Sequence, residues 1–272
     1  MPGAVETFIV DSFTDRPFRG NPAGVCLLKA ELTEELMLAI AQELGLSETA
    51  FVVPYTTANK LAIRYFSPKM EIPLCGHATL AAAKVLFEKD DACKNLQFIT
   101  KQHIDLLITR REDKIQMTFP VYRTQPATVP PALLTALGLN EHRNAVYNQE
   151  TNILLLEIAD SRVLQALEPD FTALVQAHDT INGVLVTAPS QRKGFDFESR
   201  YFWPWSGTNE DPATGGTHTF LTGYWSERLG KTKLNSFQCS ARTGFMEVEL
   251  LDEDRLVINS TARIVLQGVL WV

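Results

Sequence analysis

The chain is poor in cysteine and in basic residues, and it contains no long apolar run. Its 272 residues include only four scattered cysteines without a C-x-x-C pair, which excludes a disulfide scaffold and favours a reducing, cytoplasmic location. No segment approaches the roughly 20 apolar residues of a membrane span, and the N-terminus lacks the features of a signal peptide. Because 32 acidic residues outnumber 25 basic ones, neither nucleic acid nor a membrane is expected as a partner.

Sequence signatures of metal and cofactor sites are also missing. The five histidines form no H-E-x-x-H and no cysteine–histidine ligand spacing, so no dedicated metal site is predicted. There is no G-x-G-x-x-G after a strand and no G-x-x-x-x-G-K-[ST], which argues against dinucleotides and nucleoside triphosphates. No G-x-S-x-G nucleophile elbow occurs either. We therefore expect no metal and no cofactor.

What is present is a well-mixed globular sequence. Hydrophobic residues make up 45% of the chain and charged residues 21%, which suits either one large domain or two smaller ones with a sizeable core. In the first half, a helix is predicted over Leu32–Leu44, with Thr33 as N-cap and Gly45 at its end. A second helix, Gly76–Phe87, carries almost no charge and should be buried all round. Strands are predicted at residues 7–13, 23–28, 49–53, 61–66, 96–100, 104–110 and 115–119.

The second half repeats this order of elements. Strands are predicted at residues 183–187 and 198–203, then a helix opened by Asp211–Gly216 and running to about Leu229, then strands at 236–240, 245–251 and 256–259. A glycine-opened helix followed by three strands thus occurs twice, about 139 residues apart, which indicates an internal duplication. Two matched domains with a cleft between them would present two helix N-termini, which bind carboxylates well.

The domain boundaries follow from this repeat. Pro126–Pro131 is interpreted as the linker, and the terminal run Arg263–Val272 is expected to return to the sheet of the first domain. The predicted domains are residues 1–122 with 263–272, and residues 123–262.

Three residues are candidates for a catalytic role when they are judged from their neighbours in the sequence alone. Glu48 stands between a helix end and an apolar strand: it is either solvated or a buried carboxyl group whose pKa is raised by desolvation toward a range useful for proton transfer. His77 stands at the start of the buried helix after Gly76, and either satisfies local hydrogen bonds or relays a proton. Asp211 before Pro212 is typical of a helix N-cap, although the glycines that follow also suggest close approach of a ligand.

Four segments in register resemble a known family. Phe18–Val25, Leu46–Phe51, Ile72–Leu80 and Glu210–Gly215 look like the four signature segments of the PhzF-like phenazine biosynthesis protein family, and the resemblance runs from about residue 6 to the C-terminus. The animal phenazine biosynthesis-like domain-containing proteins resemble the chain most. Four motifs in the right order across the whole chain are far more specific than any one of them.

The resemblance implies a fold and an activity. The fold would be α+β and similar to diaminopimelate epimerase, with two pseudo-symmetric domains, each a mixed sheet wrapped around a central helix, and the active site in the interdomain cleft. The activity would be a cofactor-free isomerisation, with Glu48 as proton shuttle and His77 and Asp211 assisting. By motif position, the substrate-binding residues would be Asn21, Ser47, Gly76, Thr214, Gly215 and Gly216.

Two departures limit this transfer. Gly216 stands where the family often has serine, so one hydroxyl group is lost while backbone N–H donors remain. Cys75 occupies the position of a thiol base in two-cysteine epimerases, yet no second cysteine lies near Asp211 in the sequence. A symmetric thiol pair that works on both faces of a stereocentre is therefore not expected.

The sequence leaves three functions open. The leading one is a cofactor-independent isomerase that moves a proton between carbons of a small carboxylate-bearing substrate, with Glu48 as general acid and base. The others are an amino-acid epimerase or racemase that uses Cys75, and a binding or regulatory protein that has lost turnover, which Gly216 would favour. A homodimer and a protein partner in a regulatory role stay open.

Overall fold

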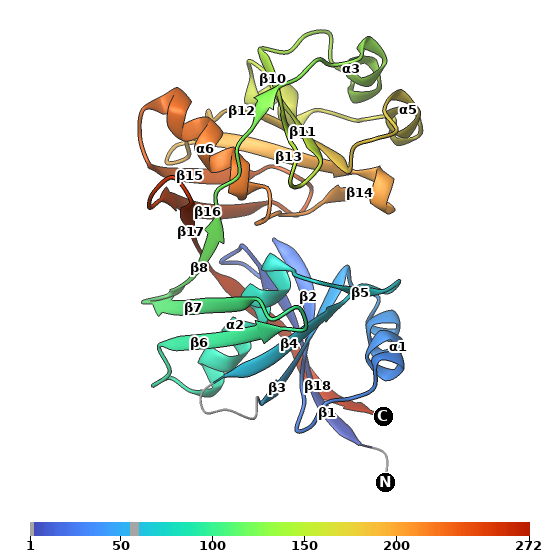
Figure 1. The fold of residues 1–272 in the computed structure, drawn as a ribbon, viewed down its shortest axis with the longest axis vertical. Helices are drawn as coiled ribbons and strands as arrows, with labels where there is room; N and C mark the ends of the chain where they lie inside the picture. The colour runs from blue at the N-terminus through green and yellow to red at the C-terminus, as the bar shows by residue number, and fades with distance from the viewer. Residues whose placement is uncertain (1–2, 55–59) are drawn as a thin grey trace. The chain divides into compact units, whose positions relative to one another are not determined.

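The computed structural model describes residues 3–54 and 60–272 (Figure 1). The chain forms two compact units, the first made of Met1–Thr118 and Ile258–Val272 and the second of Phe119–Val257. The boundaries fall inside two strands, β8 (Lys114–Pro120) and β17 (Arg255–Ser260). The boundaries predicted at residues 122 and 262 lie a few residues further along the chain.

The first unit is a mixed sheet with two helices. Its other strands are β1 (Ala4–Ser12), β2 (Asn21–Leu27), β3 (Glu48–Pro54), β4 (Leu61–Phe66), β5 (Glu71–Ile72), β6 (Asn95–Thr100), β7 (Asp105–Arg111) and β18 (Ala262–Trp271); its helices are α1 (Glu34–Leu44) and α2 (Gly76–Lys89). The strands and helices predicted for the first half are confirmed, and the turn expected between β3 and β4 lies mostly outside the described residues. The terminal run returns as predicted, because β18 pairs antiparallel with β1.

Helix α1 forms where its sequence signals place it. The Thr33 hydroxyl accepts a hydrogen bond from the backbone N–H of Leu36, and Gly45 ends the helix with a φ of 64°. The apolar stripe of α1, which includes Met37 and Ile40, packs in one cluster with Phe51 of β3. The neighbours of Phe51 in β3 point to the opposite side of the sheet and are buried too, so the sheet is covered on both faces.

Helix α2 covers the other face. It contacts β1, β2, β3 and β18, and its residues from His77 to Ala83 are all buried, as its lack of charge predicts. Its alanines let the strands approach closely while the helix keeps a high intrinsic propensity. Within residues 3–54 and 60–272, none of the helices has the length and apolarity needed to cross a membrane.

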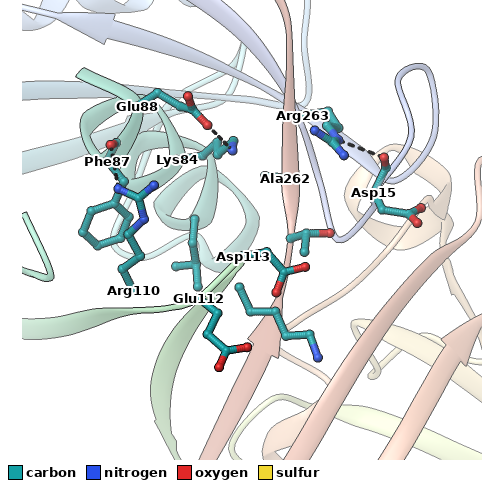
Figure 2. A pocket seen from close by; sticks show the side chains of 12 residues that line it. Asp15, Lys84, Phe87, Glu88, Arg110, Glu112, Asp113, Ala262 and Arg263 are labelled. Carbon is teal, nitrogen blue, oxygen red and sulfur yellow. Dashed lines mark hydrogen bonds and ion pairs between the residues drawn. The ribbon is translucent and has the colours of Figure 1, made fainter. Parts of the chain in front are cut away.

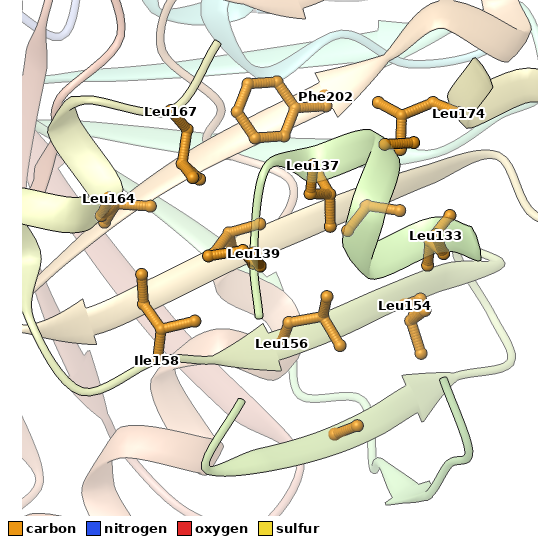
Figure 3. Close-up of a cluster of buried hydrophobic side chains, with 14 of the residues drawn as sticks. Leu133, Leu137, Leu139, Leu154, Leu156, Ile158, Leu164, Leu167, Leu174 and Phe202 are labelled. Carbon is orange, nitrogen blue, oxygen red and sulfur yellow. The ribbon is translucent and has the colours of Figure 1, made fainter. Parts of the chain in front are cut away.

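The second unit is built on the same plan with more helices. Its strands are β9 (Gln125–Pro126), β10 (Asn144–Asn148), β11 (Ile153–Glu157), β12 (Gly183–Pro189), β13 (Phe197–Trp203), β14 (Thr208–Asp211), β15 (Lys233–Gln238) and β16 (Gly244–Leu250); its helices are α3 (Pro131–Leu137), α4 (Ser161–Gln165), α5 (Phe171–Ala177) and α6 (His218–Leu229). A leucine-rich cluster joins α3, α4 and α5 to the strands, with Phe202 among its members (Figure 3).

Two predictions for this unit are wrong. Pro126–Pro131 is not a linker between the units: Pro126 pairs in β9 with β10, and Pro131 occupies the first turn of α3, where proline's missing N–H costs nothing. Asp211 does not cap α6. It ends β14, where it is paired with Tyr201, and α6 begins only at His218 after Thr217.

The two units share the same strand pairing, which confirms the repeated order of elements. In both, a parallel pair (β2–β3, β11–β12) is followed by an antiparallel pair (β3–β4, β12–β13), and the next strand after the glycine-opened helix returns parallel (β4–β6, β13–β15). The tripeptide Arg-Tyr-Phe occupies the same register in β4 and β13, starting at Arg64 and Arg200. Each arginine bonds a glutamate on the next strand, Glu71 and Glu210, with an Nε to Oε1 distance of 2.7 Å. The repeated Arg-Tyr-Phe tripeptide is visible in the sequence, but the helical and strand periodicities do not draw attention to it.

Strands β3 and β12 occupy equivalent places in the two units, but they begin with different residues. In the second unit it is Gly183, which lies against the ring of Tyr201. A Cβ atom added to Gly183 would stand 2.6 Å from the Tyr201 ring and 2.9 Å from the carbonyl oxygen of Phe202. A side chain is therefore excluded at this position.

Candidate active site

In the first unit, the predicted residues gather at the amino end of α2. Glu48 opens β3 and His77 lies in the first turn of α2, and the two side chains meet with 3.1 Å between His77 Nε2 and Glu48 Oε2. Their side chains are only 10% and 12% exposed, for His77 and Glu48 respectively. Glu48 is thus not a solvated glutamate, and His77 is held by a carboxylate from another element.

The pKa expected for Glu48 is corrected by this contact. Burial raises the pKa of Glu48, as expected. The hydrogen bond and the positive charge of His77 outweigh this effect, so the pKa of Glu48 is lower than its ordinary value of 4.5. Burial opposes the charged imidazole as well, yet its contacts with Cys75 and Glu48 raise the pKa of His77 well above 6.5. At neutral pH the two residues form a buried carboxylate–imidazolium pair.

Neighbouring groups hold this pair in position. The Ser47 hydroxyl lies 3.4 Å from His77 Nε2, and the Cys75 sulfur lies 3.4 Å from His77 Nδ1. The Ser12 hydroxyl donates to the carbonyl oxygen of His77 over 2.7 Å. Burial raises the pKa of the Cys75 thiol, while the nearby His77 opposes this shift.

Strand register brings Asn21 to the same end of the sheet. Asn21 is fully buried at the start of β2, opposite Ser12 of β1, and two residues later Ala23 pairs with Glu48. The predicted residues Asn21, Ser47, Glu48, Gly76 and His77 are therefore brought together by β2, β3 and α2.

In the second unit, the predicted residues form the loop between β14 and α6. The Thr214 hydroxyl donates to the Asp211 carboxylate, and Gly215 and Gly216 follow in the turn that leads into α6. The buried side chain of Gln238 closes this loop: its Nε2 donates to the carbonyl oxygen of Asp211 over 2.6 Å, and its Oε1 accepts from the Thr214 N–H over 2.8 Å. Gln238 thus fixes the backbone that carries Asp211 and the two glycines.

His218 supports the same loop from α6. Its Nδ1 lies 3.1 Å from the carbonyl oxygen of Thr214, which can only accept, so Nδ1 carries the proton and Nε2 accepts from the Ser236 hydroxyl at 2.8 Å. Burial lowers the pKa of His218 to about 4, so this histidine is neutral at pH 7. It has a structural function and is not a second proton donor.

Cys239 directly follows Gln238, whose amide bonds the carbonyl oxygen of Asp211. Its thiol donates to the carbonyl oxygen of Ser199 over 3.6 Å, and the residue packs against the leucine-rich cluster. Burial raises the pKa of Cys239 to about 12. This thiol does not complete a pair of thiol bases.

A hollow of about 400 Å³ in the first unit contains none of the predicted residues (Figure 2). Basic side chains such as Arg110 and acidic ones such as Glu88 alternate around it, and several of them are already paired. Arg110 lies over the ring of Phe87 and bonds its carbonyl oxygen. Because the charges compensate one another, this hollow selects no ligand charge, and we do not assign the active site to it.

Ser12, Gln238 and His218 are not indicated by the sequence. They are polar residues that the fold buries completely or nearly so. A serine, glutamine or histidine at a strand or helix end is more often exposed, and only the strand register shows what it contacts.

The sequence is similar to known proteins over almost its whole length. Residues 10–268 match the sequence pattern of the phenazine biosynthesis-like protein family. An uncharacterized isomerase of Pseudomonas aeruginosa is 46% identical, with 97% of each chain covered. The phenazine biosynthesis-like domain-containing protein of Bos taurus is 40% identical, covering 97% of this chain and 98% of that one. The expected likeness to the animal branch is confirmed, and a bacterial relative has a still higher identity.

Solved structures agree with the expected fold. A PhzF family protein of Enterococcus faecalis superimposes with a TM-score of 0.92 at 36% identity, covering 99% of this chain and all of that one. A hydroxyproline epimerase of Agrobacterium vitis superimposes with a TM-score of 0.60 at 11% identity, covering 100% of this chain and 94% of that one, and this similarity concerns the fold alone. The expected α+β, epimerase-like fold is confirmed.

Proposed function

This chain belongs to the phenazine biosynthesis-like protein family, and from that premise we propose that it is a cofactor-independent isomerase of a small carboxylate-bearing substrate. Glu48 takes a proton from one carbon of the substrate and returns it to another. The observation that carries this proposal is the buried contact of 3.1 Å between Glu48 and His77 at the start of α2. A cytoplasmic location fits the thiol of Cys75, which stays reduced there.

The proposed roles follow from the protonation states. The Glu48 carboxylate is the base that accepts the proton, and the His77 imidazolium can donate a hydrogen bond to an oxygen on which negative charge develops. We assign to Asp211 and to the backbone N–H groups of Gly215 and Gly216 the binding of the polar substituents of the substrate. The loop that carries them is fixed by Gln238, so these donors are preorganised.

Proton exchange tests the proposal without knowledge of the product. A panel of small cyclic and amino-acid carboxylates is incubated with the protein in heavy water, and loss of C–H signals is followed by NMR. We expect exchange at one carbon of at least one compound, followed by isomerisation. If compounds bind without any exchange, the protein is a binding or regulatory protein and the isomerase proposal is wrong.

An epimerase that uses Cys75 is the second candidate. The observation in its favour is the distance of 3.4 Å between Cys75 Sγ and His77 Nδ1, at which the imidazolium would stabilise a Cys75 thiolate. Against it stand the raised pKa of Cys75 and the hydrogen bond that ties the Cys239 thiol to the carbonyl oxygen of Ser199. Exchange that persists in Cys75→Ala would exclude this function.

The pH dependence of exchange should show two limbs. The ionised form of Glu48 is lost as pH falls through a pKa below 4.5, and the charged form of His77 is lost as pH rises through a pKa well above 6.5. We expect a rate that is constant between these two pKa values, falls at lower pH as Glu48 is protonated and falls at higher pH as His77 loses its charge. In His77→Gln the alkaline limb should vanish. The acid limb should move to higher pH, because burial raises the pKa of Glu48 and His77 no longer lowers it. Profiles of kcat against pH check this, and an unmoved acid limb would contradict the pair.

Gly216→Ser should add the hydroxyl group that the resemblance to the family leads us to expect at this position. No heavy atom lies within 4 Å of a Cβ added at Gly216, so the variant should fold normally. One added hydrogen bond to a carboxylate should tighten binding about 10-fold. The control is Gly223→Ser in α6, where a Cβ also meets open space. Calorimetry with a carboxylate that binds measures both, and an equal effect of the two variants would show that the hydroxyl does not reach the ligand.

A further inference from the structure

Three donor atoms of different chemistry converge at the amino end of α2. Glu48 offers a carboxylate oxygen, Cys75 a sulfur and His77 an imidazole nitrogen, and these atoms all lie within 4.8 Å of one another. Within residues 3–54 and 60–272, no other set of three histidine, cysteine or acidic side chains is gathered in this way. Spacing along the sequence does not reveal the set, because Glu48 comes from β3, His77 from α2 and Cys75 from the position just before α2.

The donors are near enough to be compared with the ligands of a tetrahedral Zn²⁺ ion. Zn–S bonds of about 2.3 Å and Zn–N or Zn–O bonds of about 2.0 to 2.1 Å place sulfur and nitrogen about 3.6 Å apart, and nitrogen and oxygen about 3.4 Å apart. In the protein, Cys75 Sγ lies 3.9 Å and Glu48 Oε2 lies 3.1 Å from His77 Nε2. The sulfur also lies 3.4 Å from His77 Nδ1, so the Cys75 side chain must change its rotamer to bond an ion held by Nε2.

The surroundings keep the ligands in place. Ser12 holds the carbonyl oxygen of His77, and the Thr79 hydroxyl donates to the carbonyl oxygen of Cys75 over 2.7 Å. The backbone that carries both helix ligands is therefore fixed before a metal arrives. The Ser47 hydroxyl, 3.4 Å from His77 Nε2, or a water molecule can fill the fourth position.

We propose that Glu48, Cys75 and His77 form an inhibitory binding site for Zn²⁺. A sulfur–nitrogen–oxygen set suits this borderline ion, whereas Mg²⁺ and Ca²⁺ require oxygen ligands. On binding, the thiol proton of Cys75 and the proton on His77 Nε2 pass to the solvent, and the freed lone pairs bond the metal; nothing is oxidised or reduced. The inhibition rests on the proposed function, because the metal would occupy the carboxylate that moves the substrate proton. The binding of the metal does not depend on the proposed function.

Cobalt provides a readout that is independent of turnover. Untagged protein is stripped with a chelator and titrated with Co²⁺ under argon, because a thiolate bound to Co²⁺ absorbs strongly in the near ultraviolet. We expect a band that saturates at one Co²⁺ per chain and disappears when one equivalent of Zn²⁺ is added. Cys75→Ser should abolish the band. Cys93→Ser is the matched control, since Cys93 lies outside the site and bonds the carbonyl oxygen of Asn95.

The outcomes separate the two proposals. His77→Gln retains the thiol and should weaken Co²⁺ binding by more than about 10-fold, since even changes around the ligands cost about 10- to 100-fold. A band that is absent in the wild type, survives Cys75→Ser or is lost in Cys93→Ser would overturn the metal site. Cobalt binding without proton exchange on any substrate would leave the site standing and refute the isomerase. Exchange that Zn²⁺ does not reduce, in a protein that binds cobalt, would refute inhibition.

Discussion

Glu48→Gln is expected to lower the rate of substrate proton exchange by about 10² to 10⁴-fold, the usual contribution of a positioned general base. Glutamine has nearly the same shape and can still accept a hydrogen bond from His77 across the 3.1 Å contact, but its amide cannot take up a proton. The fold should therefore persist while the proton transfer is lost. Loss of C–H signals in heavy water, compared at equal protein concentration, measures the effect.

The matched control for this variant is Glu43→Gln. Glu43 is an exposed glutamate near the end of α1, five residues before Glu48, so it tests whether loss of one negative charge in this segment is enough to change the rate. Its exchange rate should equal that of the wild type. Exchange that continues unchanged in Glu48→Gln would mean that another group moves the proton.

Arg200→Met is expected to reduce the free energy of unfolding of the second unit by about 3 to 5 kcal/mol, the cost of leaving one member of a buried ion pair alone. Arg200 is only 9% exposed and bonds Glu210 through two nitrogens, each at 2.7 Å. It also donates to the carbonyl oxygens of Leu164 and Leu167. Methionine fills part of the space but removes the donor that Arg200 offers to the Glu210 carboxylate and to these carbonyl oxygens.

Two further variants make this prediction specific. Arg162→Met removes an arginine whose side chain is 77% exposed, and should cost less than about 1 kcal/mol. Combining Arg200→Met with Glu210→Leu removes both charges and should be less destabilising than Arg200→Met alone. Denaturant unfolding followed by tryptophan fluorescence reports on this unit, which contains Trp203, Trp205 and Trp225. A double variant that is less stable than the single one would contradict the ion-pair explanation.

Local signals in the sequence predict much of the fold. The cap residues Thr33 and Gly45 predict both ends of α1, and the absence of charge predicts that α2 is buried. The short helices α3, α4 and α5 are not predicted, because five to seven residues contain too few turns to establish a helical period. The sequence wrongly predicts Asp211 as a helix cap, because its local pattern does not show that it pairs with Tyr201 in the sheet.

The candidate site is predictable in its residues but not in its electrostatics. Motif resemblance names Glu48 and His77, while the contact between them depends on how β3 and α2 pack. Without that contact, burial alone predicts a raised pKa for Glu48, which has the wrong sign. Gln238 shows the same limit, since nothing in its local sequence indicates that its amide bridges Asp211 and Thr214.

The glycine that opens β12 has an evolutionary consequence. In the shared register of the two units, Gly183 occupies the position of Glu48: each is the first residue of its strand, and each strand continues to a proline that ends it. Since the Tyr201 ring fills the space that a side chain would need, no single substitution can give the second unit an acid of its own at this position. An acid at this position can therefore occur in the first unit only, unless both the Tyr201 ring and the backbone at Phe202 shift.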